Sequence, residues 1–80
     1  MNSILKKLES LGFVIKVQYS KGILAILDKG SLSTMIRINK NYKGYTVEFT
    51  EFIGNNIGRT KKFNTTSCKD ICKFLDDIIK

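Results

Sequence analysis

The sequence predicts a single α+β domain in which one helix, about five antiparallel strands and a second helix follow one another. Apolar residues recur at helical spacing near both ends of the chain, and they alternate with polar residues at a period of two in the middle. Turn sequences interrupt the middle region about every ten residues, which is typical of a meander of hairpins. Since 80 residues suffice for only one hydrophobic core, residues 1–80 are expected to form one compact domain.

The first expected helix covers residues 3–11. Ile4, Leu8 and Leu11 lie on one side of it, and Gly12 follows at the position where many helices end in a left-handed glycine. Nine residues do not form a stable helix alone, so this segment must pack against another element.

The second expected helix begins after Ser67, a candidate N-cap, and Asp70 stands three residues later as in a capping box. Phe74 lies beside the apolar stripe and is expected at the flank of the packed side. The stripe itself consists of Cys68, Ile71, Cys72, Leu75, Ile78 and Ile79.

The expected strands are residues 13–19, 23–27, 34–39, 45–50 and 59–64, with turns at 20–22, 28–30, 41–44 and 54–56. Matching apolar with apolar residues pairs strand three with strand four and strand four with strand five. The same register brings opposite charges together, which favours it. The expected pairs are Ile36–Phe49, Ile38–Val47, Val47–Phe63, Phe49–Lys61, Ile53–Ile57, Arg37–Glu48, Glu48–Lys62 and Glu51–Arg59.

This register predicts a sheet with two unlike sides, and both helices are expected to cover the apolar side. The second strand is apolar throughout, so either Leu24 and Ile26, or Ile23, Ala25 and Leu27, must lie on the polar side. That patch would mark a partner surface or a dimer seam, unless one helix crosses over to cover it. The apolar side is expected to hold Phe13, Ile15, Val17, Ile36, Ile38, Val47, Phe49 and Phe63.

The chain carries 14 Lys and Arg against 7 Asp and Glu, a formal charge of +7. A positive electrostatic field of this kind attracts the phosphate backbones of nucleic acids, and the attraction does not depend on their base sequence. Tyr42 stands in a turn between two lysines, where it could stack on an unpaired base, and Tyr19 beside Lys21 is a second such pair. In the competing interpretation Tyr45 is core, Tyr42 packs on its own hairpin and the lysines keep the sheet soluble. The nucleic-acid-binding candidates are Arg37, Lys40, Tyr42, Lys43, Arg59, Lys61 and Lys62.

Other functions find little support in the sequence. There is no histidine, and Cys68 and Cys72 alone cannot complete a zinc site, so no metal, cofactor, small-molecule substrate or catalytic residue is predicted, and the protein is not expected to be an enzyme. The two cysteines are expected to be buried thiols, with a reactive Cys68 as the alternative. No apolar run is long enough to span a membrane and no secretory signal opens the chain, which predicts a cytoplasmic protein.

The element order is similar to that of the double-stranded-RNA-binding domain, although that family has three strands and a Lys-rich start to its second helix, where only Lys69 is basic here. Over residues 33–79 the order also resembles that of Whirly-type single-stranded-DNA-binding proteins, without a shared motif. The sequence therefore favours a small module that binds nucleic acid largely independently of sequence. The alternative is a protein-interaction module or inhibitor, encoded by a phage or mobile element, which docks through the sheet on an acidic or nucleic-acid-binding protein or on a second copy.

Overall fold

The computed structural model describes residues 2–79. The chain forms a helix, five consecutive strands and a second helix. Their bounds are α1 Asn2–Ser10, β1 Val14–Tyr19, β2 Gly22–Lys29, β3 Leu32–Asn41, β4 Gly44–Ile53, β5 Asn56–Thr65 and α2 Cys68–Ile79.

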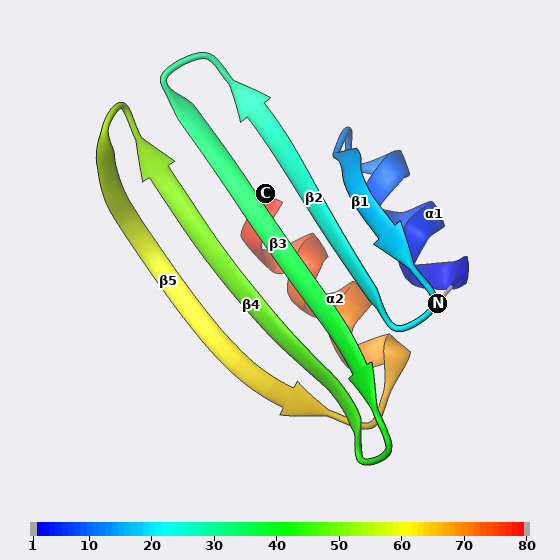
Figure 1. Ribbon diagram of the computed structural model, residues 1–80. Helices are drawn as coiled ribbons and strands as arrows, with labels where there is room; N and C mark the ends of the chain where they lie inside the picture. The colour runs from blue at the N-terminus through cyan, green and yellow to red at the C-terminus, as the bar shows by residue number, and fades with distance from the viewer. Residues whose placement is uncertain (1, 80) are drawn as a thin grey trace.

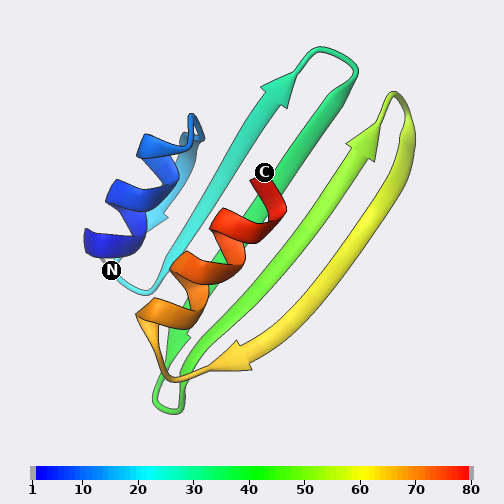
Figure 2. The ribbon, with the colours of Figure 1, turned by 180° about the vertical axis from the view of Figure 1, so that it is seen from behind.

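The strands form one antiparallel sheet in the order β1-β2-β3-β4-β5, so each strand pairs with the one that precedes it in the chain. Figure 1 shows both helices behind this sheet, and Figure 2 shows them from the other side, lying next to each other across it. The fold thus has two layers, with both helices on one side of the sheet. The predicted α+β meander is confirmed, as is the prediction that both helices cover the same side.

The core lies between the helices and the covered side of the sheet. The predicted pairs Ile36–Phe49 and Val47–Phe63 are confirmed, so β3, β4 and β5 turn these apolar residues toward the helices. Replacing one fully buried Ile or Leu by Ala costs about 2–5 kcal/mol in typical cores. The largest fully buried side chains come from both layers and are Ile4, Leu8, Ile23, Ile36, Ile38, Val47, Ile71 and Leu75.

A β-bulge at Lys16 changes which side chains of β1 face the helices. Ile15 is opposite Ala25, but the next paired residue is Val17, opposite Leu24, so Lys16 is an extra residue. One extra residue reverses the alternation of a strand. Val17 therefore lies on the side away from the helices and is 48% exposed. The prediction that Val17 belongs to the packed side is wrong for this reason.

A second irregularity lies in β5, where Gly58 and Arg59 together stand opposite Glu51. Beyond it, Ile57 pairs with Phe52 and not, as predicted, with Ile53. The hairpin consequently closes through residues 54–55, one residue fewer than the predicted turn. The extra residue in β5 accounts for both differences.

Polar side chains fix the start of α2. Ser67 is its N-cap, as predicted, because Ser67 Oγ accepts a hydrogen bond from the backbone N–H of Lys69 at 3.2 Å. Asp70 does not complete a capping box with Ser67. Its Oδ2 accepts a hydrogen bond from the Thr65 hydroxyl at 2.7 Å, and that hydroxyl accepts one from the Ser67 N–H at 3.1 Å. The end of β5 is thereby tied to the first turn of α2.

Aromatic contacts hold α2 against the sheet. The Phe74 ring meets those of Phe63 and Phe49 edge to face, with centroid distances of 4.9 and 5.8 Å. Phe74 therefore lies at the flank of the packed side, as predicted. An ion pair of 2.7 Å between Lys7 Nζ and Asp76 Oδ1 joins the two helices.

Gly44, the first residue of β4, has a φ of 130°, and a Cβ there would lie 2.5 Å from the carbonyl oxygen of Thr65. Gly54 also has a positive φ, 61°, but has open space around it.

We expect Gly44→Ala to lower the free energy of unfolding by at least about 2 kcal/mol and Gly54→Ala by about 1 kcal/mol, because only the first adds a backbone collision to the cost of positive φ. Urea unfolding followed by circular dichroism measures both; equal losses would contradict the close approach of Thr65.

Candidate nucleic-acid interface and open sheet face

The β3–β4 hairpin ends in an exposed tyrosine between two lysines. Asn41 shapes the turn, because its Oδ1 accepts a hydrogen bond from the backbone N–H of Lys43 at 2.8 Å. Tyr42 is 93% exposed and is the most exposed large hydrophobic side chain among residues 2–79. Lys43 Nζ lies 5.6 Å from the centroid of the Tyr42 ring, within cation–π range. The turn therefore offers an uncovered aromatic ring beside a positive charge.

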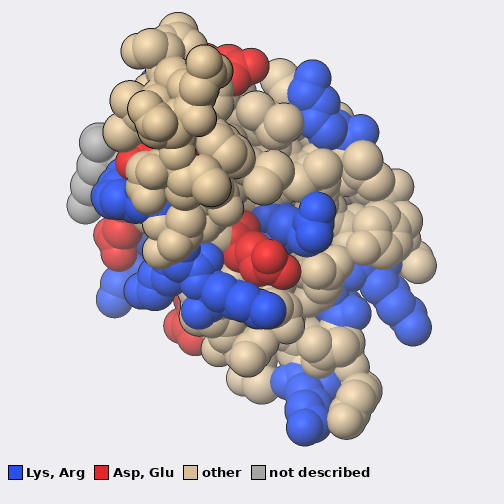
Figure 3. Space-filling view, turned by 60° about the vertical axis from the view of Figure 1, so that its left-hand side comes forward, with Lys and Arg blue, Asp and Glu red and all other residues tan. Residues whose placement is uncertain are grey.

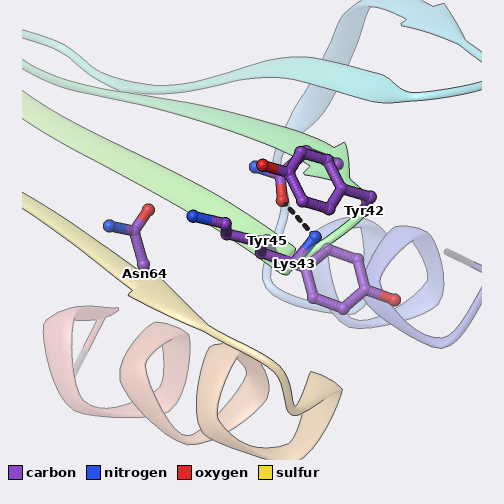
Figure 4. A pocket seen from close by; sticks show the side chains of 5 residues that line it. Tyr42, Lys43, Tyr45 and Asn64 are labelled. Atoms are coloured by element: carbon purple, nitrogen blue, oxygen red, sulfur yellow. Dashed lines mark hydrogen bonds between the residues drawn. The ribbon is translucent and has the colours of Figure 1, made fainter.

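Two shallow hollows share Asn41 and Tyr42 as a common wall. Each combines an aromatic ring, an amide and a lysine, which are groups suited to stacking on a base, bonding its edge and contacting phosphate. One hollow, of about 400 Å³, is completed by Lys43, Tyr45 and Asn64 (Figure 4). The other, of about 380 Å³, is completed by Ser20, Lys21 and Lys40.

Tyr45 is a rigid wall of the first hollow, since it is only 9% exposed. A hydrogen bond of 3.2 Å joins its hydroxyl to Cys68 Sγ in the first turn of α2. That hydrogen bond and burial raise the pKa of the Tyr45 phenol, so Tyr45 stays neutral at physiological pH. Lys40 Nζ lies 6.0 Å from the centroid of the same ring. Tyr45 thus belongs to the core, as one sequence interpretation held, while Tyr42 stands free.

Lys21 also lies at this end of the sheet, although it was not among the predicted binding residues. The backbone N–H of Lys40 donates a 2.7 Å hydrogen bond to the Lys21 carbonyl, which ties the β1–β2 turn to β3. The only sequence signal for Lys21 is its closeness to Tyr19. That tyrosine is 56% exposed, but it packs over Gly22 and donates a 3.0 Å hydrogen bond to Asn39 Oδ1, so its ring lies against the sheet. Lys21, Lys40, Tyr42 and Lys43 are referred to below as the hairpin end.

The structure distributes the seven predicted binding residues over three regions. The hairpin end holds Lys40, Tyr42 and Lys43. The side of the sheet away from the helices holds Arg37 and Lys62, in one row with Glu48 between them. The helix side holds Arg59 and Lys61, beside aromatic rings of the core. Only three of the seven therefore form one local surface.

The two residues on the helix side are held by neighbouring groups. The Arg59 guanidinium forms a bidentate ion pair with the Glu51 carboxylate, with distances of 3.1 Å from Nε to Oε1 and 3.0 Å from Nη2 to Oε2. Lys61 Nζ lies 5.8 Å from the centroid of Phe63 and 5.6 Å from that of Phe74. Both side chains already have partners within the fold, so they are less available to a phosphate group.

Basic side chains are spread over the molecule. Figure 3 shows Lys and Arg at several separate places on the side that carries the β5 edge, with acidic groups between them. The fold thus does not gather its charge of +7 into one large patch on this side. The hairpin end differs from the other basic places by its exposed ring.

The sheet face opposite the helices is uncovered over residues 2–79 (Figures 1 and 2). Strand β2 turns Leu24 and Ile26 to this side, and neither helix crosses over to cover them. The register places five apolar side chains in two neighbouring rows, Val14–Ile26–Met35 and Val17–Leu24. We call this side of the sheet the open face and these five residues its apolar patch.

The same rows continue across the open face with polar residues. The first continues through Thr50 to Thr60, and the second through Arg37 and Glu48 to Lys62. Beyond the first row lie Asp28, Ser33 and Phe52, around a hollow of about 500 Å³. The open face carries three basic residues, Lys16, Arg37 and Lys62, and two acidic ones, Asp28 and Glu48.

Within residues 2–79 no three His, Cys, Asp or Glu side chains are grouped as a metal site would require. Neither described helix has the length and hydrophobicity needed to cross a membrane. No protein-family model matches the chain, and no significant match was found among curated proteins or solved structures.

The Glu51–Arg59 pair predicts how stability depends on pH. The Arg59 guanidinium holds the pKa of the Glu51 carboxyl below its ordinary value of 4.5. A carboxyl whose pKa is lowered by folding stabilises the protein above its unfolded pKa, and this contribution is lost as the pH falls through the folded pKa. We therefore expect the free energy of unfolding to fall as the pH drops below 4.5.

Glu51→Gln should remove this part of the pH dependence, and the matched variant of the exposed helix residue Glu9, Glu9→Gln, should keep it. Urea unfolding at a series of acidic pH values measures both. A Glu51→Gln protein with the same pH dependence as the parent would show that the ion pair does not act in this way.

Proposed function

We propose that this protein is a small, non-catalytic module that binds nucleic acid at the hairpin end, largely independently of base sequence. The observation that supports the proposal is Tyr42, which is 93% exposed, next to Lys43 and between two hollows. Leaving an aromatic ring in water is unfavourable, and stacking on an unpaired base would cover it. The lysines around it would contact the flanking phosphates.

The rest of the positive charge has a different role in this proposal. Arg37, Arg59, Lys61 and Lys62 lie away from the hairpin end and contribute to the overall attraction for a polyanion. Contacts at short range would come from Lys21, Lys40 and Lys43. This division explains why binding should be sequence-independent and sensitive to salt, and it requires no cofactor and no small-molecule substrate. Two free cysteines fit the reducing cytoplasm, where such ligands are abundant.

Binding is tested by fluorescence anisotropy with labelled single-stranded and double-stranded DNA at about 50 mM salt and at higher salt. We expect Tyr42→Ala to weaken single-strand binding about tenfold, in line with the energy of one base–aromatic stack, and to change duplex binding less. Lys43→Glu should weaken binding to both, and it should reduce the slope of log affinity against log salt by about 1.

Lys29→Glu is the matched control, because Lys29 is an exposed lysine at the end of β2, next to the turn at the opposite end of the sheet. It should reduce binding less than Lys43→Glu. Equal effects of the two charge reversals would contradict a site at the hairpin end. No binding up to about 100 µM at low salt would reject nucleic-acid binding altogether.

The open face supports a second candidate function, docking of a protein partner through the sheet. The observation in its favour is the apolar patch, in which Val14 and Val17 are 57% and 48% exposed. Contiguous apolar surface of this kind commonly marks an interaction site. The partner would be an acidic protein or a second copy of the chain.

Leu24→Lys places a charge inside the apolar patch, whereas Ile53→Lys changes an exposed aliphatic residue at the end of β4 that lies outside it. A different protein that docks on the open face should be retained by immobilised parent and by Ile53→Lys, and lost from Leu24→Lys. Retention that is equal for all three proteins would contradict docking at this surface.

A further inference from the structure

We infer that the open face binds a second copy of this chain, related to the first by a twofold axis that runs across the strands between the rows of Ile26 and Leu24. The inference rests on the second candidate function, docking through the sheet, and names its partner. It is independent of nucleic-acid binding at the hairpin end.

The size of the open face is sufficient for a modest dimer. Strands spaced about 4.8 Å apart, and rows about 6.8 Å apart along each strand, give a five-strand, four-row face of about 650 Å². Two such faces would bury about 1,300 Å² in total, which lies at the lower end of the range for specific interfaces. Obligate dimers commonly bury about 2,000 Å² or more, so an interface of about 1,300 Å² should give association that depends on concentration.

The charge on the open face favours a second copy over an acidic protein. Three basic and two acidic residues leave this face with a net charge of only +1, although the whole chain carries +7. An acidic partner would gain more by binding at the hairpin end, where Lys21, Lys40 and Lys43 stand close together. A nearly neutral face with an apolar half is the surface that can approach a copy of itself with little repulsion.

The rows of the open face also fit this twofold arrangement. The axis brings the row of Val14, Ile26 and Met35 over the row of Val17, Leu24 and Arg37 in the other copy. Ile26 then faces Leu24, Val14 faces Val17, and Met35 covers the aliphatic stem of Arg37.

Farther along the same two rows, polar residues meet without conflict of charge. Thr50 faces Glu48, and Thr60 faces Lys62. Like charges are therefore not directly opposed in these rows, so the polar half of the face does not resist association. The alternative twofold axis, along β2, would set Leu24 against Leu24 and Ile26 against Ile26. A pair of complementary variants at positions 24 and 26 distinguishes the two arrangements.

This geometry leaves the hairpin ends free. Because the axis runs across the strands, it reverses their direction, and the two hairpin ends come to lie at opposite ends of the dimer. Both copies would keep Tyr42 exposed, so a dimer could hold two separate segments of nucleic acid.

Sedimentation equilibrium over a concentration series tests the association, and a pair of complementary variants tests the register. Leu24→Lys and Ile26→Glu should each weaken self-association at least tenfold, since each buries an unpaired charge. An equimolar mixture of the two should associate again, because Lys at position 24 of one copy then faces Glu at position 26 of the other, while the remaining Ile26 faces Leu24. Ile53→Lys is the control and should associate like the parent.

Circular dichroism establishes that each variant is folded. If either is not, Val17→Lys and Val14→Glu form an equivalent pair at more exposed positions. A single-chain mass up to about 1 mM would overturn the dimer. Self-association without recovery in the mixture would overturn this twofold arrangement. Neither result affects the anisotropy measurements, which test the hairpin end separately.

Discussion

The covering of one side of the sheet by two short helices is the constraint on which the rest of the molecule depends. Helices of nine and twelve residues are marginal in isolation, and an antiparallel sheet with one apolar side needs a cover. Each element is thus stable only in the presence of the other. The Phe74 ring holds α2 against the sheet, and the Lys7–Asp76 ion pair joins α2 to α1 on the same side of it. Because both helices are used there, the opposite side of the sheet stays open, and the candidate dimer surface follows from this asymmetry.

Most of the fold could be predicted from periodicity, and the register from pairing apolar with apolar and acidic with basic residues. What could not be predicted were the two bulges. In β1 both phases of the alternation begin with an apolar residue, Val14 or Ile15, so the sequence does not indicate where the pattern reverses at Lys16. In β5 the residues around Gly58 are exposed to solvent, so burial does not select one register there. Tertiary pairing with the neighbouring strand decides both positions.

The candidate site was predictable only where it is continuous in sequence. Lys40, Tyr42 and Lys43 share one turn and therefore one place. Lys61 and Lys62 are neighbours in the chain, yet they belong to a strand, and successive side chains of a strand point to opposite sides. A cluster of basic residues in a strand thus divides between the two faces, as these do. Lys21 reaches the hairpin end from another turn, because alternate turns of a meander lie at the same end of the strands. This proximity follows from the strand order and not from closeness in sequence.

The strictly sequential strand order also bears on how the chain would fold during synthesis. Each hairpin can close as soon as its second strand leaves the ribosome, so the sheet can be built from β1 onward. Helix α2 follows β5, and until it emerges Phe49, Phe63 and their neighbours stay exposed to water, because α1 lies at the β1 end of the sheet. A nascent chain in this state exposes the apolar side of its sheet. Intermediates with exposed apolar surface aggregate or bind holdase chaperones. The emergence of α2 would end that vulnerable interval.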